Sequence, residues 1–471
     1  MKLTRREFVG GMTSSAGLLL TRFKNTRDER SIAASQRNPT ASRPNIIFIL
    51  ADDLGWGDLS CYGRPDYRTP NLDGLASEGT RLTDAYSASA VCTPSRCGFI
   101  TGRYPGKFKI GLVEPLPSNN NLVGLDPGYP TIGSILKSSG YETALIGKWH
   151  LGFRPEWGPN AHGFDEFFGT LSGAVDYHLH KTGYGQPDLF ENLTPVKLTG
   201  YLTDLLTDRA VSYITRRRTK PFYLSLHYTA PHWPWQDRKG GERVTFTDKT
   251  IEPVTMGRGG SLKLYAEMMR SLDEGVGRVM KALRTAGIEK NTLVIFTSDN
   301  GGERFSYEWP FSGAKGELLE GGIRVPAIVR WPGIVPANRV TNQMAITMDW
   351  TATILAAANA TAGERYPLDG VDLLPIFRGA HPIHDRTFFW RIYNQDAVRQ
   401  GKWKYFRDGE RRTLFDLSFD QHEQADFSTK NPDVLKRLTD EFEKWNRQML
   451  PRIERRAAMI NQARSPDEHG R

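Results

Sequence analysis

The chain has 471 residues, too many for one small core, and its hydrophobic fraction of 39% and charged fraction of 24% are those of a globular protein. Part of the net charge of +9 lies in the first 30 residues, which hold seven Lys or Arg and three Asp or Glu. The remainder is only mildly basic, so no nucleic-acid partner is expected. The three cysteines, Cys61, Cys92 and Cys97, are too few for a disulfide framework.

The N-terminus has the order of an export signal. Arg5-Arg6 precedes a short, weakly apolar stretch from Val9 to Leu20, and a paired arginine in that position is typical of bacterial twin-arginine signals. The alternative is a basic tail without a targeting role. We predict a signal and linker over residues 1–35, with the cleavage site left open, export by the twin-arginine machinery, and a periplasmic or extracellular location. No other stretch has the apolar length of a transmembrane helix, so no integral membrane segment is expected.

Five short apolar runs follow, at residues 46–50, 143–146, 222–226, 293–296 and 327–329. Their length and β-branched content predict strands buried on both faces, as in a parallel sheet. Helical patterns lie between them at residues 130–138, 201–214 and 264–283, the first with Pro130 in its opening turn. The alternation predicts an α/β fold over residues 36–382, with a large mixed, mainly parallel sheet flanked by helices.

The pattern changes after about residue 382. Residues 387–390, 396–406 and 413–417 predict short antiparallel strands, with turn residues at Gly401 and Asp408-Gly409. Asn431 and Pro432 then predict the N-cap and first residue of an amphipathic helix. Residues 383–471 are therefore expected to form a small α+β domain of antiparallel strands and one helix.

Acidic and amide side chains follow two of the predicted strands. Asp52-Asp53 comes directly after the first strand, and Asp299-Asn300 follows the strand at 293–296. The first pair alone is equally typical of an exposed loop, but ligands of open α/β sheets gather at the carboxyl ends of the strands. Because the four side chains offer only oxygen, they favour a hard cation, Ca²⁺ or Mg²⁺, over Zn²⁺.

Cationic and imidazole side chains also follow predicted strands or lie in loops between them. Lys148 and His150 come after the strand at 143–146, His232 follows the strand at 222–226, and Lys315 precedes the strand at 327–329. Singly, each is most simply a surface or structural residue. Together at one sheet edge, beside a cation, they predict a site for a tetrahedral oxyanion.

Cys92 opens the stretch Cys92-Thr93-Pro94-Ser95-Arg96, which we interpret as a loop tip ahead of a short helix from Ser95 to Thr101. Taken alone, Cys92 could be a buried structural thiol, since free cysteine is among the most buried residue types. Whether Cys61 and Cys97 pair with one another is open.

This stretch, continued by Gly102-Arg103, resembles the signature of the type I sulfatases, which are arylsulfatase-like members of the alkaline phosphatase superfamily. The strand-end blocks match further motifs of that family, in order, from Pro44 to about Pro326. The resemblance implies an alkaline phosphatase-like sheet and a sulfatase that cleaves a sulfate monoester, either an aryl sulfate or a sulfated carbohydrate.

Several roles are implied by the resemblance. A maturation enzyme oxidises Cys92 to formylglycine, whose hydrate is the nucleophile. Calcium, rather than magnesium, is bound by Asp52, Asp53, Asp299, Asn300 and the modified Cys92. The catalytic roles fall on Arg96 and His150, which hold the hydrate, on Lys148 and Lys315, which bind sulfate, and on His232, which protonates the leaving oxygen.

Two other functions fit the same residues. A phosphonate monoester or phosphodiester hydrolase could use the same cation, lysines and formylglycine. A protein of a different class, an inactive binder of sulfated glycans, would keep Cys92 unmodified and stack Trp149, Trp233 and Trp235 on sugar rings. The intact cassette favours the sulfatase.

Overall fold

The computed structural model describes residues 43–118, 120–240, 259–380 and 386–453. The predicted signal, linker and cleavage site lie outside the described residues, as do the proposed domain boundary at 382–383 and the C-terminal tail. The described residues all belong to one compact unit, Arg43–Arg471.

The main sheet has ten strands in the order β11-β2-β10-β9-β1-β8-β4-β5-β6-β7. All five predicted strands are in it, as β1 (Asn45–Asp52), β4 (Glu142–Lys148), β8 (Phe222–Pro231), β9 (Thr292–Ser298) and β10 (Ala327–Arg330). The first four are mutually parallel, whereas β10 runs antiparallel to β9. The sheet is therefore mixed and mainly parallel at its centre, as predicted. The outer strands are β2 (Thr80–Leu82), β5 (Glu166–Thr170), β6 (Phe190–Glu191), β7 (Thr194–Pro195) and β11 (Arg339–Thr341).

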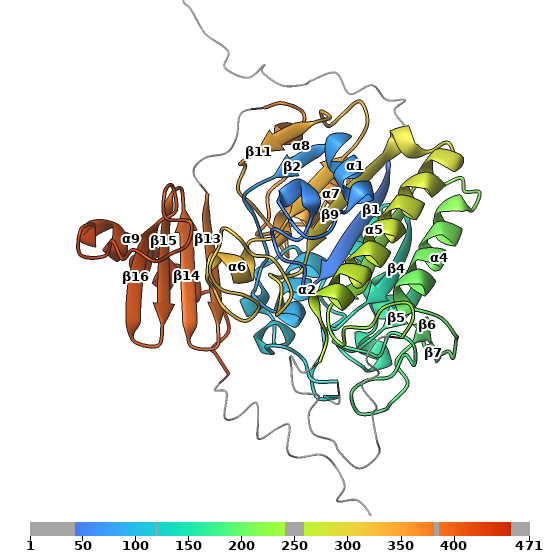
Figure 1. Cartoon of the computed structure of the whole chain (residues 1–471), viewed down its shortest axis with the longest axis horizontal. Coiled ribbons are helices and arrows are strands. Elements are labelled where there is room, and N and C mark those ends of the chain that lie inside the picture. The colour runs from blue at the N-terminus through green and yellow to red at the C-terminus, as the bar shows by residue number, and fades with distance from the viewer. Residues whose placement is uncertain (1–42, 119, 241–258, 381–385, 454–471) are drawn as a thin grey trace, which may run out of the picture. The chain divides into compact units, whose positions relative to one another are not determined.

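Helices cover both faces of this sheet (Figure 1). Ile47 and Ile49 of β1 pack in one core with α1 (Pro70–Ser77), α4 (Leu202–Thr215) and α5 (Leu262–Thr285). The alternate residues Ile46, Phe48 and Leu50 pack in a second core with α2 (Cys92–Thr101), α3 (Ile132–Ser138) and α7 (Thr347–Ala357). Because both faces are buried, the strand is apolar throughout instead of alternating.

The helix predicted at residues 130–138 begins later than expected. Thr131 is its N-cap, and the Thr131 hydroxyl accepts a hydrogen bond from the Ser134 N–H. Pro130 therefore precedes the helix instead of lying in its first turn. The other two predicted helices, α4 and α5, begin and end within two residues of the expected bounds.

The C-terminal unit is a four-stranded antiparallel sheet of β13 (Thr387–Ile392), β14 (Gln395–Gln400), β15 (Trp403–Asp408) and β16 (Arg411–Asp416). Residues 396–406 contain parts of two strands, because the turn predicted at Gly401, with φ of 55°, separates β14 from β15. The helix α9 (Pro432–Asn446) follows its predicted N-cap, Asn431, and packs through Leu438, Phe442 and Trp445 on one face of the sheet. The Trp390 indole N–H, on β13, donates to the Ser87 carbonyl oxygen at 2.8 Å, next to α2.

Short elements complete the described residues. They are β3 (Ala85–Tyr86), β12 (Ala345–Ile346), α6 (Glu320–Ile323), α8 (Leu374–Phe377) and six 3₁₀ turns at Ser60–Tyr62, Pro105–Lys107, Ile110–Leu112, Pro155–Trp157, Pro159–His162 and Glu289–Asn291. Cys61, Cys92 and Cys97 are all free thiols, so Cys61 and Cys97 do not pair. Over the described ranges, no helix combines the length and apolarity needed to cross a bilayer.

Candidate active site

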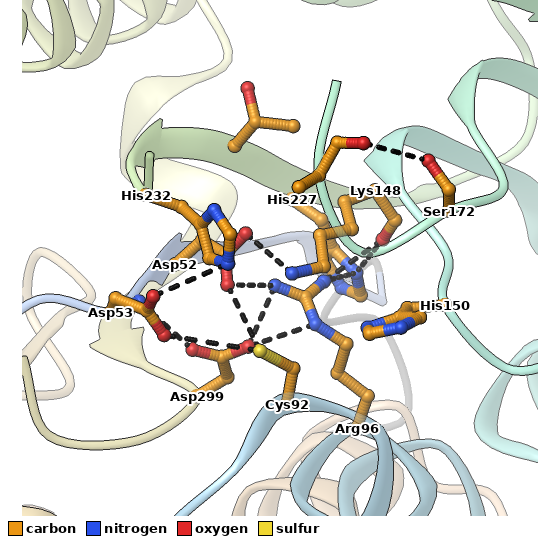
Figure 2. Close-up of polar contacts among 12 residues, drawn as sticks. Asp52, Asp53, Cys92, Arg96, Lys148, His150, Ser172, His227, His232 and Asp299 are labelled. Carbon is orange, nitrogen blue, oxygen red and sulfur yellow. Dashed lines mark hydrogen bonds and ion pairs between the residues drawn. The ribbon is translucent and has the colours of Figure 1, made fainter. Parts of the chain in front are cut away.

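The predicted site residues lie at the carboxyl edge of the parallel strands. Asp52 ends β1 and Lys148 ends β4, while His232 directly follows β8 and Asp299 directly follows β9. Parallel strands end at the same edge, so side chains far apart in the sequence meet there (Figure 2). Cys92 is brought to the same place as the first residue of α2. The prediction that Cys92 lies at a loop tip is wrong, because the helix begins at Cys92, three residues earlier than expected.

The Cys92 thiol points at two carboxylates. Its Sγ atom lies 3.6 Å from Asp52 Oδ1 and 3.9 Å from Asp53 Oδ1, and the residue is 1% exposed. Burial raises the pKa of this thiol well above its usual value, and Asp52 and Asp299 raise it further, although Lys148 and Lys315 oppose them. An unmodified Cys92 is therefore a protonated thiol at neutral pH and a poor nucleophile.

Three cations neutralise the acidic cluster. Lys148 Nζ lies 2.6 Å from Asp52 Oδ2, and Lys315 Nζ lies 2.6 Å from Asp53 Oδ2. Arg96 is fully buried and bonds Asp299 Oδ2 through Nε at 2.9 Å and Nη2 at 2.8 Å. Burial alone would raise the pKa of the Asp53 carboxyl. The nearby Lys315, His232 and Lys148 have the larger combined effect and lower that pKa below its usual range. Each lysine is thus paired with a carboxylate of the cluster. Both ammonium groups are close enough to bind an anionic group placed beside that cluster.

The site contains a group of side chains that could hold a metal ion. One ligand atom each from Asp52, Asp53, Cys92 and His232 lies within 4.8 Å of the others, and all four residues are buried. Asp299 adjoins this group, since its Oδ1 accepts the Asp53 N–H at 3.2 Å. Asn300 Oδ1 is buried and accepts no hydrogen bond within the described part of the chain.

A buried amide oxygen that accepts no hydrogen bond is unfavourable unless a cation coordinates it. Asp299 and Asn300 are therefore further residues that could hold a cation, whereas both nitrogens of His232 have other partners. Asp53 has φ of 60°, in the left-handed region. A non-glycine residue held there is strained, and such strain is concentrated at functional sites.

His232 has a defined tautomer. Its Nδ1 lies 2.5 Å from the Trp233 carbonyl oxygen, which can only accept, so Nδ1 carries the proton. Its Nε2 then faces Lys315 Nζ at 3.3 Å and Asp53 Oδ2 at 3.4 Å as an acceptor. Burial lowers the pKa of His232 to about 4, since the effect of Lys315 and Lys148 adds to it and Asp53 only partly compensates. Neutral His232 thus accepts a hydrogen bond from the Lys315 ammonium in this arrangement.

His150 also has one nitrogen in use and one free. Its Nε2–H donates to the Leu116 carbonyl oxygen at 2.7 Å, and its buried Nδ1 has no partner among the described residues. Burial lowers the pKa of His150 well below its usual value, and Lys148 lowers it further. His150 is therefore a neutral ring with an unused acceptor, held at a φ of 60°.

Two further residues at the site were not predicted. His227 Nδ1 lies 3.1 Å from the Lys148 carbonyl oxygen, to which its N–H can donate, so His227 supports the end of β4. Glu303 Oε1 lies 3.0 Å from Lys315 Nζ. A histidine inside the buried strand β8 and an acid directly after Gly302 were the available signals in the sequence.

The aromatic platform of the glycan-binder hypothesis is not formed as predicted. Trp149 and Trp235 are 1% and 4% exposed and belong to the two cores on either side of the sheet. Only Trp233 keeps partial exposure. Two of the three indoles therefore have no free face for a sugar ring.

Comparison with known proteins agrees with this geometry. A family model described as Sulfatase matches residues 44–360, and one described as N-sulphoglucosamine sulphohydrolase, C-terminal, matches residues 314–448. The N-acetylgalactosamine-6-sulfatase of Rattus norvegicus is 34% identical over 387 residues, which cover 77% of this chain and 71% of the relative. Arylsulfatase J of Mus musculus is 31% identical, covering 87% of this chain and 77% of the relative.

Among solved structures, Ps i-CgsB in complex with k-i-k-neocarrahexaose is 32% identical, with a TM-score of 0.79, covering 90% of this chain and 97% of that one. The phosphonate monoester hydrolase of Agrobacterium radiobacter has a TM-score of 0.63, covering 87% of this chain and 96% of that one, at 20% identity, which supports the shared alkaline phosphatase-like fold alone. On the length of the family match and the identity to its relatives, the chain belongs to the sulfatase family and is an enzyme that hydrolyses sulfate esters.

Proposed function

We propose that this sulfatase cleaves a sulfate monoester of a carbohydrate at the site centred on residue 92, with Cys92 oxidised to formylglycine. The observation that carries the proposal is the Cys92 Sγ atom directed at Asp52 and Asp53, with Lys148 and Lys315 each 2.6 Å from one of those carboxylates. The catalytic domain is residues 36–382, and residues 383–471 form the appended domain.

Calcium, rather than magnesium, is the proposed cation, held by Asp52, Asp53, Asp299, Asn300 and the modified residue 92. Its contribution is to polarise the sulfate oxygens and to favour ionisation of a hydroxyl bound beside it. The hydrated aldehyde of formylglycine supplies that hydroxyl, together with a geminal one that allows sulfate to be released by elimination. A serine in this place has no second hydroxyl and would need a separate hydrolysis.

The cationic side chains stabilise charge on the sulfate group. Lys148 is fully buried and Lys315 nearly so, and charge interactions in a water-poor site are stronger than in solvent. Both ammonium groups are already held in place by Asp52 and Asp53, so little reorganisation is needed when an anion arrives. Arg96, fixed by Asp299 and by the Lys148 carbonyl oxygen at 2.9 Å, orients the start of α2 and with it residue 92.

The proton for the leaving oxygen comes from the pair of Lys315 and His232. Because Nε2 of neutral His232 accepts from Lys315 at 3.3 Å, His232 alone has no proton to give from that atom. An anionic sulfate ester bound beside Nε2 favours the protonated imidazolium, so His232 takes up a proton as substrate binds and then donates it, while the Trp233 carbonyl holds its ring in position and the Lys315 ammonium stabilises the departing oxygen. General-acid steps of this kind typically contribute ~10²–10⁴-fold. A second histidine serves the nucleophile: the unused Nδ1 of His150 is the acceptor for a hydroxyl proton of residue 92.

Burial of Cys92 bears on when the modification takes place. The residue is 1% exposed and lies in the first turn of a helix whose ten residues are all buried. A maturation enzyme needs the cysteine in an accessible, extended segment, so oxidation precedes folding. If the N-terminal segment is a twin-arginine signal, which exports folded proteins, the oxidation takes place in the cytoplasm before export to the periplasm.

Two relatives support a carbohydrate substrate. One is named for N-acetylgalactosamine, and one was solved with a neocarrahexaose. The test is to compare kcat/KM on sulfated galactose and hexosamine oligosaccharides, on 4-nitrophenyl sulfate and on an aryl phosphonate. We expect turnover of both sulfates, with the larger kcat/KM on an oligosaccharide. A preference for the phosphonate would replace the proposal by the phosphonate hydrolase alternative.

A further inference from the structure

A polar network outside the reacting centre joins the two loops that carry the proposed calcium ligands. Glu308 accepts the Trp56 N–H at 3.1 Å and the Gly302 N–H at 2.7 Å. Trp56 lies three residues after Asp53, and Gly302 lies two residues after Asn300. One carboxyl group therefore bonds the backbone of both loops just beyond their ligands.

The close packing of this network depends on two glycines. A Cβ atom on Gly55 would lie 2.1 Å from Ser306 Oγ and 2.4 Å from Glu308 Oε1, and one on Gly302 would lie 1.9 Å from Ser306 Oγ. Both loops thus leave room for Glu308 and Ser306. Such close approach is a common reason for glycine in a loop.

The hydrogen bonds of Ser306 require an additional proton. Its Oγ atom lies 2.8 Å from Asp58 Oδ2 and 2.8 Å from Glu308 Oε1. A hydroxyl has one proton, and ionised carboxylates can only accept. If both acids were ionised, one of these short oxygen–oxygen contacts would contain no hydrogen. One of the two carboxyl groups therefore carries a proton.

The partners of each acid decide which one carries it. Asp58 is paired with the Arg64 guanidinium at 2.6 Å and also accepts from the Tyr265 hydroxyl and the Gly55 and Tyr307 N–H groups. No ion pair joins Glu308 to any described residue, and the charged group that influences its pKa, Asp58, is itself an acid. The charge thus stays on Asp58, and Glu308 is neutral.

We propose that Glu308 is a positioning residue: its neutral carboxyl donates to Ser306, whose hydroxyl donates to Asp58, and this chain clamps the loop after β1 to the loop after β9 at the spacing that calcium requires. The proposal rests on the proposed function only in naming calcium as the cation. Supporting contacts run between the same two loops, from the Leu54 N–H to Ser298 Oγ at 3.0 Å and from the Gly57 N–H to the Tyr307 carbonyl oxygen at 2.8 Å.

Protonation of Glu308 gives the clamp a pH dependence. The Glu308 residue is partly buried, and its carboxyl group lies inside the network. Burial of that carboxyl group, together with the negative charge of Asp58, raises the pKa of Glu308 to about 8. The other titratable groups packed around the network, Arg64, Tyr67 and Tyr265, all contact Asp58. The pKa of Glu308 is higher in the folded chain than its unfolded value of about 4.5. The protonated carboxyl therefore contributes its full stabilisation of the folded state below pH 4.5, and this contribution is lost as the pH rises through about 8.

The first test measures the proton directly and needs no turnover. Urea unfolding of the full chain and of Glu308→Gln is compared from pH 5.5 to 9 at a fixed, saturating calcium concentration. We expect the ratio of the wild-type folding equilibrium constant to that of the variant to fall by up to about tenfold per pH unit until pH 8 and then to level off. A wild-type-to-variant ratio that is independent of pH would overturn the proposal.

The second test measures positioning as calcium affinity, read from the calcium-dependent shift in unfolding of the unmodified chain. Glu308→Ala is expected to bind calcium about 10–100-fold more weakly, as outer-shell changes typically do, and Glu308→Gln to recover most of the loss at pH 7. Asp273→Asn is the control, because this buried acid caps α1 through the Asn71 and Leu72 N–H groups. It should lower stability without changing calcium affinity.

Wild-type affinity in Glu308→Ala, or equal losses in the Ala and Gln variants, would refute the positioning role. If Glu308→Ala does not fold, Ser306→Ala breaks the same chain and takes its place. A wild type that binds no calcium would count against the proposed function, while the pH comparison would still decide the state of Glu308.

Discussion

Replacement of His232 by alanine tests how the leaving oxygen is protonated. His232 Nε2 lies 3.3 Å from Lys315 Nζ and 3.4 Å from Asp53 Oδ2, and its ring is fixed through the Trp233 carbonyl. Loss of a general acid costs ~10²–10⁴-fold, or ~2.7–5.4 kcal/mol of transition-state stabilisation. Lys315 remains in the variant and can still donate, so we expect the lower half of that range, about 10²–10³-fold.

The loss should depend on the leaving group. An alcohol departing from an alkyl or sugar sulfate needs a proton, whereas 4-nitrophenolate departs as a stabilised anion. We therefore expect kcat/KM of His232→Ala to fall about 10²–10³-fold on the sugar sulfate and less than about tenfold on 4-nitrophenyl sulfate. His422→Ala is the matched control, because His422 belongs to the appended domain and its ring packs on the exposed Trp309. Equal losses on both substrates would refute proton donation and leave His232 a role in sulfate binding only.

Three other perturbations address the charges around the site and between the domains. Lys148→Met leaves the fully buried Asp52 without its ammonium partner at 2.6 Å, so without calcium we expect it to cost ~3–5 kcal/mol in urea unfolding; an unchanged midpoint would contradict this. Chelation by EGTA should lower the melting temperature, and calcium at 100 times its Kd should restore ~2.7 kcal/mol, whereas no response to either would argue against a cation site. Lys404→Met should cost ~3–5 kcal/mol because Lys404, fully buried, pairs with Glu320 at 3.0 Å and Glu423 at 2.7 Å; stability equal to that of the wild type would show that this pair contributes little.

Much of the fold could be predicted because its central strands are buried on both faces. Continuous apolar runs such as Ile46 to Leu50 have no other simple interpretation, and each predicted run is a strand. The direction of β10 could not be predicted, since an antiparallel strand buried in the same sheet has the same apolar composition. The turn between β14 and β15 was predictable from Gly401, whereas the exact bounds of the two strands were not, because both share the same alternation.

The sequence predicted which residues form the candidate site better than it predicted how they are arranged. Strand ends place Asp52, Lys148 and Asp299 at one edge, and the structure brings them within ion-pair distance of shared partners. The start of α2 at Cys92 was not predicted, since its N-cap, Val91, has no capping side chain to mark it. The glycan-binder alternative used Trp149 in a sugar platform because packing and binding indoles look alike in sequence, and only the fold shows that it is core.

The account depends most directly on the chemical state of residue 92. Mass spectrometry of the peptide spanning Cys92, from active protein produced in a host with a maturation system, measures that state. We predict a peptide in which the thiol has been replaced by an aldehyde or its hydrate, in an amount that scales with specific activity, and no turnover in Cys92→Ala despite a native fold. Active protein that contains only unmodified cysteine at this position would contradict the central claim.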